Sequence, residues 1–268
     1  MFYWLMKFVF LGPLLRLLFR PRAVGLENVP TDGPAIIAAN HVSPLDTVLL
    51  PLVVPHRQVF FLAKAEYFRS WKTRWFFQGA ATIPVERGGP NSTAALQAAI
   101  DALRDGKLVG IFPEGTRSPD GRLHRGKTGV ARMALEARVP VIPVACVGTF
   151  EAWPYDRKFP RRGRTEIRFG KPLTFERHYD TPTDRFVLRS VTDEIMYEIM
   201  LLSGQEYVDE YGSKMKRQLE RAKATGESEA GEEHAPAGTT PGSKRAGAAV
   251  GAGGQAGPDS KPGRSASA

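Results

Sequence analysis

The stretch PAIIAANHVSPLDTVLLPLVV, residues 34–54, joins two apolar runs through a short polar junction. The first run, PAIIAAN at 34–40, has the length and composition of a buried strand. His41 follows it directly. The next residues, SPLD, are typical of a helix start, with Ser43 as the N-cap, a proline at the first position and Asp46 at the third. The junction therefore predicts a strand, a turn and a helix, with an imidazole and a carboxylate at the turn.

The alternation of strand-like and helix-like runs continues to about residue 180. Further strands are predicted at 57–64, 79–85, 107–113, 139–147 and 164–173, and further helices at 91–106, 129–140, 183–204 and 206–223. Near-continuous apolar strands that alternate with helices indicate a sheet covered on both faces. The sequence therefore predicts an α/β fold with a mixed, largely parallel sheet flanked by helices.

The first 22 residues, MFYWLMKFVFLGPLLRLLFRPR, are strongly apolar but are interrupted by charges and by a Gly-Pro pair. A membrane-spanning helix needs about 20 predominantly apolar residues, so this segment is a poor candidate for one. Two short helices in the membrane interface fit better, with rings such as Phe19 in the lipid and Lys7, Arg20 and Arg22 at anionic headgroups. The alternative is a helix packed on the protein's own core. We predict an interfacial helical anchor over residues 1–24.

Charge and composition divide the remainder of the 268 residues. The stretch 223–268 is rich in Ala, Gly, Pro and Ser and holds five basic and five acidic residues. It lacks the apolar side chains needed to offset the entropy of ordering, so we predict a disordered tail there and an α/β domain over 25–222. The formal net charge of +9 then belongs to the folded part, which should prefer anionic partners.

Nucleic acid is not among the expected partners, because no DNA- or RNA-binding motif is present. A phosphorylated substrate or a membrane surface with anionic lipids fits the charge better. The only cysteine, Cys146, lies in an apolar run and reads as a small buried side chain. A single cysteine also excludes an intramolecular disulfide framework and fits a reducing compartment.

Two further stretches carry side chains suited to chemistry. The run IFPEGTRS, residues 111–118, ends a strand with Glu114 and Arg117 in a tight turn, and GAATIPVERG, residues 79–88, ends another strand with Arg87. A guanidinium group is a planar fork that matches a phosphate. The alternatives are a surface ion pair for the glutamate and arginine, and simple helix capping for the aspartate of the first junction.

Taken together and in this order, these stretches resemble the glycerolipid acyltransferase family. NHVSPLD resembles its H-x4-D box, ATIPVER its second block, IFPEGTRS its third, VPVIPVA at 139–145 its fourth, and LAKAEYF at 62–68 a lysine segment. The resemblance covers about residues 25–180, and the ordered set is more specific than any single motif. It implies a glycerol-3-phosphate acyltransferase-like fold.

The resemblance also implies roles for individual residues. His41 would be the general base, and Asp46 would orient it. Val139 to Pro143 would help to shape the acyl side. The part of the substrate that carries the glycerol phosphate would be bound by Arg87, Glu114, Gly115, Thr116 and Arg117, with Lys64 as an addition.

The activity that follows is transfer of a fatty acyl group from acyl-CoA or an acyl carrier protein to lysophosphatidic acid, which gives phosphatidic acid. The enzyme would work at the cytoplasmic face of the cell membrane. No metal or other cofactor is expected, because the sequence has no HExxH motif or Cys/His ligand set. Two alternatives stay open: the same chemistry on glycerol 3-phosphate, a lysophospholipid or a lyso-aminolipid, and a non-catalytic lipid-binding protein. Ser43 as a covalent nucleophile is a weaker idea, since no G-x-S-x-G elbow surrounds it.

Overall fold

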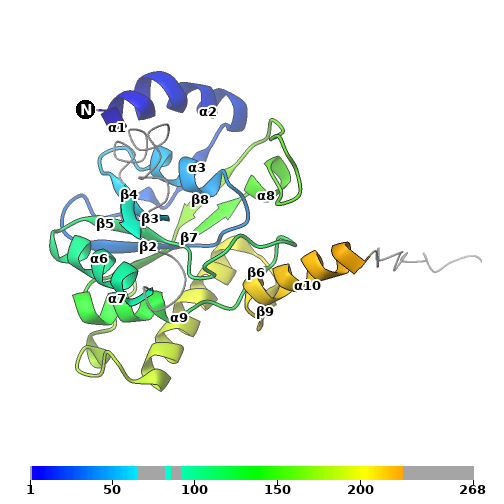
Figure 1. Cartoon of the computed structure of the whole chain (residues 1–268). Helices are drawn as coiled ribbons and strands as arrows, with labels where there is room; N and C mark the ends of the chain where they lie inside the picture. Colours follow the sequence, from blue (N-terminus) through cyan, green and yellow to red (C-terminus); the bar gives the residue numbers. More distant parts are fainter. Residues whose placement is uncertain (1, 65–81, 86–91, 226–268) are drawn as a thin grey trace, which may run out of the picture. The chain divides into compact units, whose positions relative to one another are not determined.

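The computed structural model describes residues 2–64, 82–85 and 92–225. A seven-stranded sheet runs through it in the order β1-β8-β7-β2-β5-β3-β4 (Figure 1). The strands are β1 (Arg22–Val24), β2 (Ala35–Ala39), β3 (Val59–Lys64), β4 (Thr82–Val85), β5 (Leu108–Ile111), β7 (Val141–Val147) and β8 (Glu166–Phe169). All neighbouring pairs are parallel except β7 and β8, which are antiparallel. The predicted mixed, largely parallel sheet is confirmed.

Strand β2 lies at the centre of the sheet, and all five of its residues are fully buried. Ile36 and Ala38 pack into one hydrophobic cluster, whereas Ile37 and Ala39 pack into a second cluster on the other face. Successive side chains of a strand point to opposite faces. Burial on both faces therefore explains why the strand reads as an uninterrupted apolar run in the sequence.

Helices cover both faces of the sheet (Figure 1). One face carries α6 (Ser92–Arg104), α7 (Gly129–Ala137) and α9 (Arg185–Ser203), and the other carries α2 (Leu11–Phe19) and α3 (Asp46–Val53). The shorter α8 (Thr149–Ala152), the C-terminal α10 (Gly212–Thr225) and the 3₁₀ turns η2 (Leu26–Asn28) and η4 (Glu176–His178) complete this part of the chain. The helix predicted at 91–106 is α6, and Gly106, two residues after its end, has a φ of +78°, the left-handed conformation that its position in the sequence indicated.

The N-terminal segment is one continuous helical stretch and not two separate helices. It consists of α1 (Phe2–Leu5), a π-helical turn η1 (Met6–Phe10) and α2. The predicted break at the Gly-Pro pair is wrong because the wider π turn carries the chain into α2, with Pro13 inside that helix. A Cβ atom added to Gly12 would lie 1.7 Å from the carbonyl oxygen of Lys7, so only glycine fits there.

Two of the side chains predicted to meet the membrane are buried instead. Phe19 is 2% exposed and packs in the core under α2, and Lys7 is 6% exposed. The Lys7 ammonium donates to the carbonyl oxygen of Val54 at the C-terminal end of α3, a position where a cation is favourable. Burial, with a contribution from Arg16, lowers the pKa of Lys7 to about 8. The inner face of this segment thus belongs to the folded body.

The outer face of the same segment is apolar and exposed. Its side chains are Leu5, Phe8, Val9, Phe10, Leu14 and Leu17, each at least 41% exposed. None of the helices in the described part of the chain is long and apolar enough to span a membrane.

The sequence did not predict three short strands. These are β1, β6 (Leu123–His124) and β9 (Tyr207–Val208), of which the last two pair with each other in a separate small sheet. Because β9 occupies the start of the predicted helix 206–223, α10 begins only at Gly212. The helix ends at Thr225, and the rest of the predicted tail lies outside the described residues.

Candidate active site

His41 leaves the sheet at the carboxyl end of β2, the edge where ligands bind in open α/β sheets. The residue before it, Asn40, is 1% exposed and joins β2 to the neighbouring β7. The Asn40 side-chain oxygen accepts the Cys146 backbone N–H at 2.7 Å, and its amide nitrogen donates to the Cys146 carbonyl at 3.2 Å. This side-chain bridge extends the contact between the two strands to the residue before His41. It therefore fixes the point at which the His41 loop leaves the sheet.

Asp46 is fully buried, and one of its oxygens, Oδ2, makes three contacts. It lies 3.0 Å from Nδ1 of His41 and accepts the backbone N–H groups of Val42 and Ser43, each at 2.8 Å. The predicted Ser43 cap is wrong, because α3 begins only at Asp46 and its N-cap, Leu45, has no side-chain cap. The Asp46 carboxylate instead holds the turn before the helix and contacts the histidine at the same time. If His41 is neutral, this contact places its hydrogen on Nδ1 and leaves the lone pair on Nε2.

The imidazole of His41 lies against an apolar wall. Its ring stacks on Phe112, with 4.0 Å between centroids, and Phe112 stacks in turn on Phe61 at 5.4 Å. A Cβ atom added to Gly110 would lie 2.5 Å from the Phe61 ring, so this stack requires glycine in β5. The His41 side chain keeps 15% of its surface exposed, and Nε2 has no hydrogen-bond partner among the described residues. A substrate proton can therefore reach it.

Glu114 lies behind His41 and faces inward. It is 1% exposed; Oε1 accepts the backbone N–H of His41 at 2.9 Å, and Oε2 accepts the backbone N–H of His124 at 3.1 Å. Burial raises the pKa of Glu114 to about 8, against the lowering effect of these two N–H groups, and the neighbouring Asp46 raises it further.

This geometry does not fit the predicted contact of Glu114 with a substrate phosphate, because both of its oxygens are occupied and enclosed. We propose instead that Glu114 is a positioning residue that connects the His41 loop to β6. The sequence pattern placed the glutamate in the right turn but could not show which way its side chain points.

Replacement of Glu114 by alanine should destabilise the fold strongly. It leaves the N–H groups of His41 and His124 buried without an acceptor, at about 1–3 kcal/mol each, so we expect the free energy of unfolding to fall by about 2–6 kcal/mol. Urea denaturation measures this value. As a control, Glu194→Ala removes an exposed carboxylate paired at 3.7 Å with Arg177 and should change the stability by less than about 0.5 kcal/mol.

The sign of the pH dependence follows from the raised pKa. The folded state holds the Glu114 proton more tightly than the unfolded state, whose reference pKa is 4.5. Its contribution to stability is thus fully present below pH 4.5 and is lost as the pH rises through about 8. Glu114→Gln should remove this part of the pH dependence, and identical pH profiles for the two proteins would contradict the assignment.

The PEGTR turn packs against the histidine loop and presents cations. The Ser118 N–H donates to the His41 carbonyl at 2.7 Å, and Gly115 has a φ of +70° that favours glycine. A Cβ atom added to Gly115 would lie 3.0 Å from Nζ of Lys127, so this lysine lies over the turn. The Arg117 guanidinium stands 5.4 Å from the centre of the Tyr155 ring. The turn that contacts the His41 loop therefore carries one cation, Arg117, and lies beneath a second, Lys127.

A buried polar cluster supports this turn from behind. His124 is fully buried, and its Nε2 lies 2.9 Å from Asp120, which also pairs with Arg122 at 2.7 Å. Partial burial tends to raise the pKa of Asp120, but hydrogen bonds from His124, Arg122 and Ser118 outweigh it and hold the pKa well below its usual range. The cluster fixes the chain between the turn and β6.

The other predicted site residues have different outcomes. Lys64 is the last residue of β3, and only its backbone is described; Arg87 lies outside the described residues. The stretch from Val139 to Pro143 begins β7 at the edge of the sheet opposite to His41, and its apolar side chains are buried in the core, which does not fit a contact with an acyl chain. Ser43 is fully buried and donates to the Trp153 carbonyl at 2.8 Å, so it is not accessible as a nucleophile.

The sequence reasoning assigned no role to Asn40, Phe112 or Lys127. Asn40 and Phe112 adjoin motif residues, and their place in the chain could have marked them as neighbours of the site. Lys127 comes into the turn only through the path of the chain after β6, and no spacing rule indicates it.

Comparison with known proteins agrees with this architecture. Residues 20–147 match the acyltransferase family. The chain is 30% identical to the 1-acyl-sn-glycerol-3-phosphate acyltransferase of Bacillus subtilis, over 55% of this chain and 70% of that protein. It is 35% identical to the chloroplastic enzyme LPAT1 of Arabidopsis thaliana over 56% of this chain, but that match spans only 42% of the relative.

A solved structure is also similar. The crystal structure of PlsC, the 1-acyl-sn-glycerophosphate acyltransferase of Thermotoga maritima, aligns with a TM-score of 0.55 at 28% identity, over 68% of this chain and 71% of that one. The chain therefore belongs to the acyltransferase family. The resemblance that the sequence motifs indicated is confirmed.

Proposed function

We propose that this acyltransferase moves a fatty acyl group from a thioester donor, acyl-CoA or an acyl carrier protein, to the free hydroxyl of 1-acyl-glycerol 3-phosphate. The product is phosphatidic acid, a precursor of phospholipids. The observation that carries the proposal is the contact between His41 and Asp46 beside a cationic turn at the carboxyl edge of the sheet. The names of the similar proteins support the choice of acceptor.

The histidine supplies the general base. As the acceptor oxygen attacks the thioester carbonyl carbon, its proton passes to Nε2 of His41, and Asp46 stabilises the imidazolium that results. When the carbon–sulfur bond breaks, the imidazolium returns that proton to the leaving thiolate. The balance is one ester formed, one thioester cleaved and one free thiol released, and the protein itself carries no acyl group at any stage.

The cationic turn positions the acceptor. Arg117 and Lys127 would hold the phosphate of the lysolipid, with Gly115 and Thr116 bringing the backbone close to it, and Arg87 and Lys64 are proposed as additional cations. Binding of the phosphate would place the hydroxyl at Nε2, and such positioning lowers the barrier by avoiding the entropy loss of a bimolecular encounter. Phe112 and Phe61 form an apolar wall on which an acyl chain could pack.

The exposed apolar face of α1, η1 and α2 supports attachment to a membrane. A helix with one apolar face and flanking cations lies in the plane of the interface, and the net charge of +9 favours anionic lipids. We propose that the enzyme is held at the cytoplasmic face of the cell membrane, where its lysolipid acceptor and its product reside.

Thiol release from acyl-CoA tests the function and the role of Arg117 together. We expect the wild-type enzyme to release thiol with lysophosphatidic acid. For Arg117→Ala, kcat/KM for this acceptor should fall roughly 10- to 100-fold. The reason is that the variant loses a hydrogen bond to a charged group, which contributes about 1.5–3 kcal/mol. Activity with monoacylglycerol, which lacks the phosphate, should not change.

Arg104→Ala is the matched control, because it removes an exposed arginine of α6 paired with Asp101. It should leave both acceptors unaffected. An equal loss with both acceptors in Arg117→Ala would contradict the phosphate role of this arginine. Faster thiol release with glycerol 3-phosphate, a lysophospholipid or a lyso-aminolipid would assign one of these as the acceptor, and lipid binding without any thiol release would contradict catalysis.

A further inference from the structure

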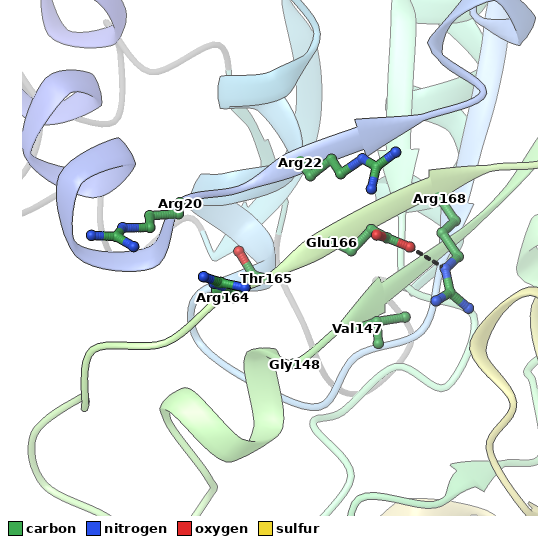
Figure 2. Close-up of a pocket in the computed structure, with 8 residues that line it drawn as sticks. All are labelled: Arg20, Arg22, Val147, Gly148, Arg164, Thr165, Glu166 and Arg168. Carbon is green, nitrogen blue, oxygen red and sulfur yellow. Dashed lines mark hydrogen bonds and ion pairs between the residues drawn. The ribbon is translucent and has the colours of Figure 1, made fainter.

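A second group of cations lies at the same edge of the sheet, outside the site around His41. Strand β7 separates β8 from β2, and because β7 and β8 are antiparallel, β8 begins at the edge where β2 ends. Strand β1 runs parallel to β8 and begins there as well, with Arg22 opposite Glu166. Arg20, Arg22, Arg164 and Arg168 surround a cavity at this place, which we call the arginine pocket (Figure 2).

The backbone holds the segments of the arginine pocket together. The Thr165 N–H donates to the Phe19 carbonyl at 3.0 Å, at the end of α2, and the Arg22 N–H donates to the Thr165 carbonyl at 3.0 Å. Two arginines at the end of α2 and the start of β1, and two others just before and within β8, are thereby brought around one cavity of about 470 Å³. This volume lies within the range of roughly 300–1,000 Å³ that is usual for small-molecule sites.

The charge of the arginine pocket is only partly balanced. Glu166 pairs with Arg168 at 2.6 Å (Figure 2). Arg168 also donates to the Leu202 carbonyl at 2.8 Å. The guanidinium groups of Arg20, Arg22 and Arg164 make no ion pair or hydrogen bond with the part of the chain that the structure describes. Several like charges around a cavity repel one another unless an anion joins them, and guanidinium forks match phosphate oxygens.

Arg20 adds a second observation. Its φ of 42° and ψ of 53° are left-handed, and it ends α2 at a position where glycine would be free of strain. Only Arg20 and Arg138 among the described non-glycine residues have a positive φ. Arg138 has partners, since it contacts Asp180 at 3.4 Å and the ring of Tyr179. The Arg20 backbone N–H closes α2 by donating to the Arg16 carbonyl at 3.0 Å, but its guanidinium group has no partner in the described part of the chain. The helix end therefore directs an unpaired cation to the pocket.

We propose that the arginine pocket binds a phosphate ester. Two molecules could supply the phosphate ester: an anionic phospholipid of the membrane, and the CoA part of the donor. The inference rests on the proposed function only for this choice of molecules. The surroundings favour the lipid headgroup, because the two segments that lead into the pocket carry exposed apolar side chains: Leu14 and Leu17 on α2 and Phe159 in the loop before β8 are 52%, 61% and 70% exposed.

Arg20→Gly tests the pocket with a matched control. This change and Arg138→Gly each remove one charge and relieve one left-handed residue, so neither should lower the melting temperature. Flotation with vesicles of phosphatidylcholine and phosphatidic acid, and titration with CoA, then measure phosphate binding. Arg20→Gly, but not Arg138→Gly, should weaken binding to the vesicles or to CoA about fivefold. This is the equivalent of roughly 1 kcal/mol for one arginine near the surface.

A larger effect is expected for Arg22→Gln combined with Arg164→Gln. Removal of two cations should weaken binding roughly 30-fold, whereas Arg104→Gln with Arg185→Gln, two exposed arginines of α6 and α9, should leave it unchanged. Loss with vesicles alone assigns a lipid headgroup, and loss with CoA alone assigns the donor. An equal loss of binding in the Arg22/Arg164 and the Arg104/Arg185 double variants, or no loss in either, would overturn the proposal.

Binding is measured without turnover, which separates this inference from the proposed function. His41→Ala should bind vesicles and CoA like the wild type while it transfers no acyl group. If the proposed transfer were wrong but the pocket correct, the arginine variants would still show the binding loss. If the pocket were wrong, they would bind like their controls, whatever the activity.

Discussion

His41→Ala should reduce acyl transfer by about 10²–10⁴-fold or more, because it removes the general base. The fold should be preserved. The contacts that hold the loop are the His41 backbone N–H to Glu114 and the His41 carbonyl to Ser118, and an alanine keeps both. The substitution therefore separates chemistry from architecture. Thiol release from acyl-CoA in the presence of lysophosphatidic acid measures the loss, and thermal melting checks the fold.

His56→Ala is the matched control, because His56 is an exposed histidine in the loop before β3. It should retain full activity. Turnover of His41→Ala within tenfold of the wild type would exclude the imidazole as the base. A lower melting temperature by itself would indicate only that the ring supports Phe112, on which it stacks.

The central part of the fold was predictable from the sequence. Strands that are buried on both faces, such as β2, give apolar runs without alternation, and α6 carries a periodic stripe with Gly106 after its end. The short strands β6 and β9 were not predictable, because two residues form no periodic pattern and the pairing joins positions 84 residues apart, Leu123 and Tyr207. Long-range pairing of this kind leaves no local signal.

The N-terminal segment shows a different limit. Its composition correctly indicated an amphipathic helical stretch, but the choice of inner and outer residues depends on the turn geometry. A π turn adds a residue to one turn and rotates everything after it, including Phe19, which lies in the core. Lys7 lies within the π turn and reaches the end of α3. A Gly-Pro pair predicts a break in the helix when all helical turns are assumed to be regular α-helical turns.

For the site, the sequence indicated which segments meet but not how each side chain is used. The order of the motifs brings His41, Asp46 and the PEGTR turn to one edge of the sheet, since parallel strands end there together. A carboxylate in such a turn reads as a binding residue. Only coordinates show that Glu114 points inward to two backbone N–H groups, and that Lys127 supplies a cation from outside the motif.

Asp46→Asn should lower kcat by about 10²–10⁴-fold with little change in KM, because Asp46 acts on His41 and does not touch the substrate. The asparagine oxygen still accepts the N–H groups of Val42 and Ser43, so most of the loop structure should persist. What is lost is the negative charge that stabilises the imidazolium. Asp46→Ala should in addition destabilise the fold, by about 1–3 kcal/mol for each N–H left without an acceptor.

Asp184→Asn is a control in which the carboxylate also accepts two backbone N–H groups. Asp184 precedes α9 and accepts the N–H groups of Phe186 and Val187 at 2.8 and 3.0 Å, with no histidine beside it. Asp184→Asn should therefore leave kcat unchanged. If Asp46→Asn and Asp184→Asn alter kcat to the same small extent, the carboxylate at position 46 serves only to hold the turn before the helix. A large loss of kcat for Asp46→Asn alone, at a nearly unchanged melting temperature, would show that the charge beside the imidazole is what catalysis requires.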